Sequence, residues 1–145
     1  MNSKNSKDIS SSYDTILKES AALVTFSGIL FGFILNISIN PPDTFSYIDK
    51  ILLLITLYTI TIAACLFVMP IIYHHLQYPY HDFEKFRKRS HRFILYGLIP
   101  VGITLIIALG ISSSLLINKS IFIPLSLIPF ILITVLYLKR KWITD

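Results

Sequence analysis

Four long stretches of this 145-residue chain contain no charged side chain, and they constrain its fold more than any other feature. They cover approximately residues 21–39, 51–73, 93–118 and 121–138. A helix rises about 1.5 Å per residue, so roughly 17 to 25 residues cross a hydrocarbon core of about 30 Å. Each stretch meets this requirement, the fourth at the short end. The sequence therefore predicts four membrane-spanning segments.

The spans are expected to be helices. Backbone groups inside a bilayer must be satisfied internally, which leaves helices and closed barrels. The four stretches lack the alternation of polar and apolar residues that barrel strands need. Composition agrees with a membrane protein, because 54% of the residues are hydrophobic and only 14% are charged, against about a quarter charged in a soluble domain. We therefore expect an all-α, polytopic membrane protein with four transmembrane helices.

The positions of Lys and Arg predict the orientation, because these residues are retained on the cytoplasmic side of a membrane. Eleven of the thirteen lie before the first span, between the second and third spans, or after the fourth. Only Lys50 and Lys119 lie on the opposite side. We expect a multi-pass protein of the cell membrane with both termini in the cytoplasm. Topology alone accounts for the net charge of +5, so no nucleic-acid partner is expected.

Residues 1–12 are polar and are expected to form a disordered cytoplasmic lead, followed by a single transmembrane domain over residues 13–145. Ser11 and Asp14 have the spacing of a capping box, which predicts a first helix from about residue 12 to residue 39. The prolines after Asn40 end this helix, since proline cannot continue the helical hydrogen bonds.

The connection between the second and third spans is the most informative polar stretch. Phe83, Phe86, Ser90 and Phe93 recur at helical spacing, while most of the cations lie off this line. This pattern predicts a short cytoplasmic amphipathic helix at the membrane surface, with the lipid bilayer as its partner. Simple anchoring and docking to a specific acidic lipid or protein both remain open. The expected lipid headgroup contacts are Lys85, Arg87, Lys88 and Arg89.

No metal, cofactor or catalytic group is expected. The four histidines near Asp82 and Glu84 do not have the four-residue spacing that places two metal ligands on one helix face, and none lies near a span centre. The single cysteine, Cys65, excludes an intrachain disulfide. No span interior holds an Asp, Glu, Lys, Arg or His residue, which argues against a pump or a coupled transporter. The histidines are His74, His75, His81 and His91.

Two glycines of the first span, Gly28 and Gly32, form a GxxxG motif that lets another helix approach closely. Packing inside the bundle and contact with another subunit are both consistent with the motif. The absence of catalytic groups favours a non-catalytic accessory, structural or assembly subunit of a larger membrane complex, such as a membrane-bound oxidase or monooxygenase. Partners would then be other membrane subunits or a second copy. The alternative is a homo-oligomeric small channel or transporter.

The second span ends in the run Pro70-Ile71-Ile72-Tyr73-His74-His75-Leu76, and a basic loop with His91-Arg92 and then Gly97 comes after it. This Pro-x-x-Tyr-His-x-Leu pattern resembles a family of small prokaryotic four-helix integral membrane proteins of unknown function. The resemblance covers roughly residues 13–116 and includes a Glu-bearing lead into the first span, here Glu19. His75 and His91 depart from the family, which has Arg and Asn there.

The resemblance marks Tyr73, His74 and Arg92 for attention, and it implies no activity. One hypothesis is that His74 bonds to Glu19 or Asp14 of the first helix and so pins the inner ends of the bundle together. With Gly28 and Gly32, these residues are the candidate structural or interface positions.

Overall fold

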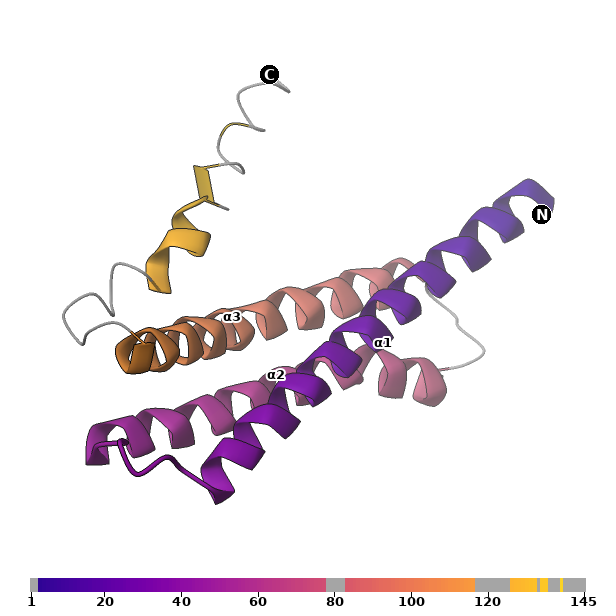
Figure 1. Ribbon diagram of the computed structural model, residues 1–145. Helices are drawn as coiled ribbons and strands as arrows, with labels where there is room; N and C mark the ends of the chain where they lie inside the picture. Colours follow the sequence, from indigo (N-terminus) through magenta and orange to yellow (C-terminus); the bar gives the residue numbers. More distant parts are fainter. Residues whose placement is uncertain (1–2, 78–82, 117–125, 133, 136–138, 140–145) are drawn as a thin grey trace.

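The computed structural model describes residues 3–77, 83–116, 126–132, 134, 135 and 139, and its regular elements in these ranges are all helices (Figure 1). Three are long: α1 (Ser3–Ile39), α2 (Tyr47–Gln77) and α3 (Phe83–Leu116). Residues 126–132 form a shorter, fourth helix. The predicted all-α class is therefore confirmed.

The three long helices are also apolar enough to cross a membrane. Their candidate spans are Tyr13–Ile39, Tyr47–Leu76 and Phe83–Ser113. These ranges contain the first two predicted spans and most of the third. Half of the fourth predicted span, 121–138, lies outside the described residues, so its crossing of the membrane stays a prediction. In its described part, the ring of Phe130 lies near α3, because a Cβ built on Gly102 would lie 3.7 Å from a carbon of that ring.

The first helix starts earlier than the sequence predicts. It begins at Ser3, so Ser11 lies inside α1 and does not cap it. Adding residues to an existing helix is far easier than nucleating one, and the polar lead contains neither proline nor glycine to stop it. The helix of the apolar segment that follows therefore extends back into the polar lead.

A capping box does occur at the start of α2. The Ser46 hydroxyl donates to Oδ2 of Asp49 at 2.6 Å, and the Ser46 amide donates to the same oxygen at 2.9 Å. The Asp49 amide lies 3.4 Å from Oγ of Ser46. These reciprocal bonds satisfy amides that the first turn of a helix leaves open. They fix α2 directly after the proline-containing turn that ends α1.

The amphipathic segment before the third span is the first part of α3 and not a separate helix. No proline or glycine lies between Phe83 and Gly97, so the backbone has no reason to break where the charged segment meets the apolar one. The cations of this segment therefore lie on the same continuous helix as the third span. Its predicted place at a cytoplasmic membrane surface stays a prediction.

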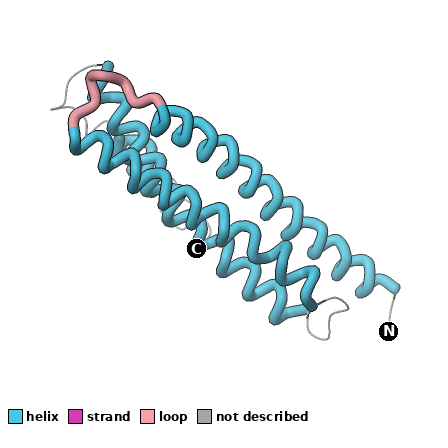
Figure 2. The backbone as a smooth tube through the Cα atoms, turned by 90° about the horizontal axis from the view of Figure 1, so that it is seen from below, coloured by secondary structure: helices cyan, strands magenta, loops and turns pink. Residues whose placement is uncertain are grey.

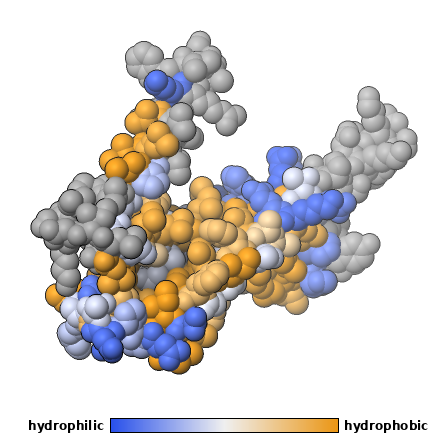
Figure 3. Space-filling model, viewed as in Figure 1, coloured by the Kyte–Doolittle hydropathy of each residue, from blue (hydrophilic) through white to orange (hydrophobic). Residues whose placement is uncertain are grey.

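The core lies between the three long helices. α2 packs against both α1 and α3, whereas α1 touches α3 much less, and Figure 2 shows the three running side by side. Ile60, Ala63 and Phe67 of α2 are fully buried at the centre. The face seen in Figure 3 carries an apolar band between two hydrophilic ends. Such an outer surface suits a helical bundle surrounded by lipid.

Candidate functional site

Five aromatic side chains gather where α2 ends and α3 begins. We call Tyr13, Tyr73, His74, Phe83 and Phe86 the aromatic cluster. The Tyr13 ring of α1 lies 4.4 Å from the Phe83 ring in an edge-on arrangement and 5.2 Å from the Phe86 ring. Tyr73 stacks on Phe86 at 6.0 Å. Because Phe86 is fully buried among them, the cluster joins all three long helices at this end of the bundle.

Arg89 contacts this cluster through Tyr73, and its predicted contact with a lipid headgroup stays a prediction. Its guanidinium donates a hydrogen bond to the Tyr73 hydroxyl. Its Cζ also lies 5.6 Å from the centre of the Tyr73 ring, within the range of a cation–π interaction. Arg89 therefore ties the start of α3 to the end of α2.

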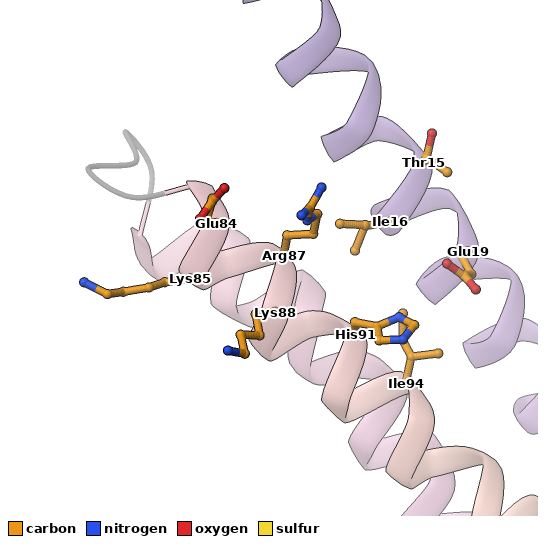
Figure 4. A pocket seen from close by; sticks show the side chains of 9 residues that line it. All are labelled: Thr15, Ile16, Glu19, Glu84, Lys85, Arg87, Lys88, His91 and Ile94. Atoms are coloured by element: carbon orange, nitrogen blue, oxygen red, sulfur yellow. The ribbon is translucent and has the colours of Figure 1, made fainter.

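A groove of about 820 Å³ separates α1 from the first turns of α3 (Figure 4). We call it the basic groove. One wall is built by Thr15, Ile16 and Glu19 of α1. The other wall consists of residues that recur at helical spacing along one face of α3: Glu84, Lys85, Arg87, Lys88, His91 and Ile94. Three predicted headgroup contacts, Lys85, Arg87 and Lys88, thus share one concave site.

The basic groove holds charges of both signs that do not neutralise one another. Arg87, Lys88, Glu19 and Glu84 are exposed and form no hydrogen bond or ion pair within the part of the chain that the structure describes. In Figure 4, the His91 ring extends toward α1, on the side where Glu19 lies. A groove with uncompensated cations and carboxylates is suited to a ligand that itself carries both charges.

The described residues include no group of three His, Cys, Asp or Glu side chains close enough to hold a metal ion. His74 and His75 are adjacent, with ring centres 5.5 Å apart, but His74 also packs on Tyr13 and Phe86. His91 lies in the basic groove, and His81 falls outside the described residues. Contact with other rings is thus the role that the structure gives to His74.

Below the aromatic cluster, the three helices meet at one tightly packed point. The buried Ser20 hydroxyl of α1 donates to the carbonyl oxygen of Phe67 in α2. The ring of Phe67 lies directly against the backbone of Gly97 in α3. Phe67 lies in the turn before Pro70, next to Leu66, whose carbonyl loses its helical donor because proline has no N–H. We call these three residues the Ser20–Phe67–Gly97 contact.

Deeper in the bundle, a hydroxyl pair joins α2 to α3. Oγ1 of Thr59 lies 2.8 Å from Oγ1 of the buried Thr104. Thr59 also donates to the carbonyl oxygen of Thr56 at 3.0 Å, so Thr104 is the donor to Thr59.

The other predicted site residues lie apart from one another. Arg92 is exposed and lines neither the basic groove nor the aromatic cluster. Glu19 lies at the groove, whereas His74 lies in the cluster, and the structure shows no hydrogen bond between them. Gly28 and Gly32 are exposed, and a Cβ at either position would meet no described atom within 4 Å. The described part of the bundle therefore does not use the GxxxG motif for its own packing.

Several residues that hold the site together were not singled out by the sequence. Tyr13, Ser20 and Phe67 carry contacts between helices, yet none of them belongs to a motif that the sequence analysis identifies. A usable signal exists for Ser20, because Ser20 and Ser27 are small residues seven positions apart and so lie on one helix face that a neighbour can approach closely. The ring of Tyr13 has no comparable signal, since its partners lie on other helices.

One family model, described as a family of unknown function (DUF6328), matches residues 4–140 of the chain. Neither the curated proteins nor the solved structures contain a match. The sequence-based resemblance to a family of unknown function is thereby confirmed at that level. The Pro-x-x-Tyr-His-x-Leu motif and the four-helix, prokaryotic character of the family stay predictions.

Proposed function

The chain belongs to this family of unknown function (DUF6328), and we propose that it acts as a non-catalytic accessory or structural subunit of a larger membrane assembly. In this role α1 packs against a transmembrane helix of another subunit. The observation that carries the proposal is the open face of α1 around Gly28 and Gly32. The three candidate membrane spans of the chain support a role inside the bilayer.

The uncovered face of α1 supports contact with another helix. In its most apolar stretch, 11% of α1 is buried, against 28% of α2 and 33% of α3. Ala21, Thr25, Gly28 and Gly32 are all exposed and recur at helical spacing, so they form one face of small residues. Small residues at such spacing let two helix backbones approach closely in a membrane, where van der Waals packing drives association.

No observation in the described residues favours the channel or transporter alternative over this role. A pore needs polar groups that are available to a permeating species. The exposed hydroxyls of Thr25 and Thr61 instead donate to the carbonyl oxygens of Ala21 and Leu57 within their own helices, at 3.0 and 2.8 Å. These threonines are therefore engaged in local helical bonds.

Purification of the full-length chain from its native membrane in mild detergent tests the proposal, with native mass spectrometry of the co-purifying chains. We expect foreign membrane subunits in stoichiometric amounts. The double variant Gly28→Leu/Gly32→Leu should lose them, because two large side chains prevent close approach of the partner helix. Ala22→Leu is the matched control, since Ala22 is exposed on the same helix but lies off the small-residue face.

Two results would contradict the proposal. A symmetric oligomer of this chain alone would favour the homo-oligomeric alternative. Foreign subunits that remain bound to the Gly28→Leu/Gly32→Leu variant as well as to the wild type would show that α1 does not carry the contact.

A further inference from the structure

We infer that the basic groove binds the headgroup of an ethanolamine phospholipid, with its phosphate on Arg87 and Lys88 and its ammonium on Glu84. This lipid site is distinct from the proposed subunit contact at Gly28 and Gly32. It requires only that the three long helices cross a bilayer.

The first support is the shape of the site. The basic groove is a concavity of about 820 Å³ between two helices, at the level where the charged part of α3 meets its apolar part. Ile16 on one wall and Ile94 on the other give it apolar sides. The cations of such a site match the phosphate of a phospholipid. The apolar walls next to them match its acyl chains.

The second support is the charge of the lining. Arg87 and Lys88 are adjacent, exposed and without ion pairs among the described residues. Arg87 already points toward α1, and the flexible Lys88 side chain, which points away in Figure 4, has to turn toward the groove to reach the same phosphate. Arg presents several N–H donors in a planar fork that matches phosphate geometry. Glu84 and Glu19 line the same groove, and a headgroup that carries only negative charge leaves these two carboxylates without a partner. A zwitterionic headgroup satisfies both sets of charges.

The third support is the order of these groups along α3. Glu84 comes first, Arg87 and Lys88 are placed about one helical turn later, and Ile94 lies nearest the apolar part of the helix. An ethanolamine phospholipid has the same covalent order of ammonium, phosphate and acyl chains. A carboxylate accepts hydrogen bonds from a primary ammonium, whereas the quaternary ammonium of choline has no N–H to donate.

Arg89 and Arg92 are not part of the site. Arg89 is engaged with Tyr73, and Arg92 does not line the groove. Arg87 and Lys88 therefore belong to the lipid site, whereas Arg89 and Arg92 lie outside it. Arg92 supplies a matched control with the same charge on the same helix.

The test is native mass spectrometry of the detergent-purified full-length chain, titrated with dioleoyl phosphatidylethanolamine, phosphatidylcholine and phosphatidylglycerol. We expect the ethanolamine lipid to bind about threefold more tightly than either of the others, as expected for one exposed charge pair. Arg87→Gln/Lys88→Gln should weaken its binding by about threefold or more, while Arg92→Gln leaves it unchanged. Thermal stability equal to that of the wild type confirms that each variant is folded.

The Glu84→Gln variant tests the ammonium contact through a ratio that protein yield does not affect. It should bind the ethanolamine and choline lipids equally, whereas Asp43→Asn, an exposed acid in the connection between α1 and α2, keeps the preference. Equal binding of the two lipids by the wild type, or tightest binding of phosphatidylglycerol, would overturn the inference.

A competition experiment distinguishes a lipid from a free headgroup. Water-soluble glycerophosphoethanolamine has the phosphate and the ammonium but no acyl chain to lie along Ile16 and Ile94. We expect it not to displace the lipid at equal concentration. Displacement to the same extent as by the lipid itself would show that the groove recognises a soluble phosphate compound and would overturn the assignment to a lipid.

Discussion

The ring of Phe67 in α2 occupies the space where a side chain at Gly97 of α3 would begin. A Cβ built on Gly97 would lie 2.8 Å from Cδ1 and 3.0 Å from Cζ of that ring. Phe67 is fully buried, so the ring cannot turn out into the surroundings of the bundle. Gly97 is therefore required for the close approach of α2 and α3.

The variant Gly97→Ala should destabilise the protein, although alanine favours a helix more than glycine does. The propensity gain is about 1 kcal/mol. Overpacking of a filled core typically costs about 1–3 kcal/mol. We expect a net loss in the free energy of unfolding, measured by SDS titration in mixed micelles.

Two variants control for the change of residue type. Gly102→Ala places its Cβ 3.7 Å from Phe130, an ordinary contact, and should be neutral or stabilising. Phe67→Leu combined with Gly97→Ala should recover part of the stability lost by Gly97→Ala alone, since the smaller side chain makes room for the methyl group. Gly97→Ala at wild-type stability would mean that Phe67 does not fill this space.

The hydrogen bond from Ser20 to the Phe67 carbonyl provides a second prediction. Ser20→Ala should lower the free energy of unfolding by about 0.6 kcal/mol, and by no more than about 1.7 kcal/mol, the range measured for hydrogen bonds between membrane helices. Ser27 is the matched control, because it is equally buried on α1 but its hydroxyl has no partner among the described residues. Ser27→Ala should be neutral or stabilising. Equal losses in both variants would contradict a specific role for Ser20.

Much of this fold can be predicted from the sequence because bilayer thickness sets the length of an uncharged segment. Three of the four predicted spans fall in α1, α2 and α3 for this reason. The start of α1 at Ser3 is harder to predict. A polar lead becomes helical when the segment after it already forms a helix, and it is disordered when that segment does not. The capping box has the same difficulty, because Ser11–Asp14 and Ser46–Asp49 have the same spacing and only the second begins a helix.

The site is only partly predictable. Helical spacing places Arg87, Lys88 and His91 on one face, but the opposite wall with Ile16 depends on how α1 crosses α3, which no local pattern encodes. Arg89 has the same charge and lies one residue from Lys88, yet it bonds Tyr73. Sequence identifies the cations of this segment, and packing decides which of them remain available to a ligand.

The aromatic cluster gives a third prediction, at the basic end of the bundle. Phe86 is fully buried between Tyr13 and Tyr73, so Phe86→Ala should reduce the free energy of unfolding by about 3–5 kcal/mol. Phe86→Leu should recover part of this loss, because it refills some of the volume. Phe33→Ala is the control, since Phe33 is 66% exposed on α1 and leaves no cavity. A similar, small loss for Phe86→Ala and Phe33→Ala would mean that the cluster does not join the helices.

The threonine pair between α2 and α3 gives the last prediction, which a double-mutant cycle measures. Thr104→Val keeps the shape of the side chain and removes the donor that lies 2.8 Å from Oγ1 of Thr59. Because Thr59 keeps its own bond to the Thr56 carbonyl, the loss should be small, about 0.6 kcal/mol. In SDS titration, the Thr59→Val/Thr104→Val variant should be less destabilised than the sum of the single variants, since the bond between them is lost only once. Losses of stability that simply add would show that the two hydroxyls do not interact. Thr61→Val is the control, because it removes an exposed hydroxyl bonded within α2. Its loss of stability should add to that of Thr104→Val without coupling.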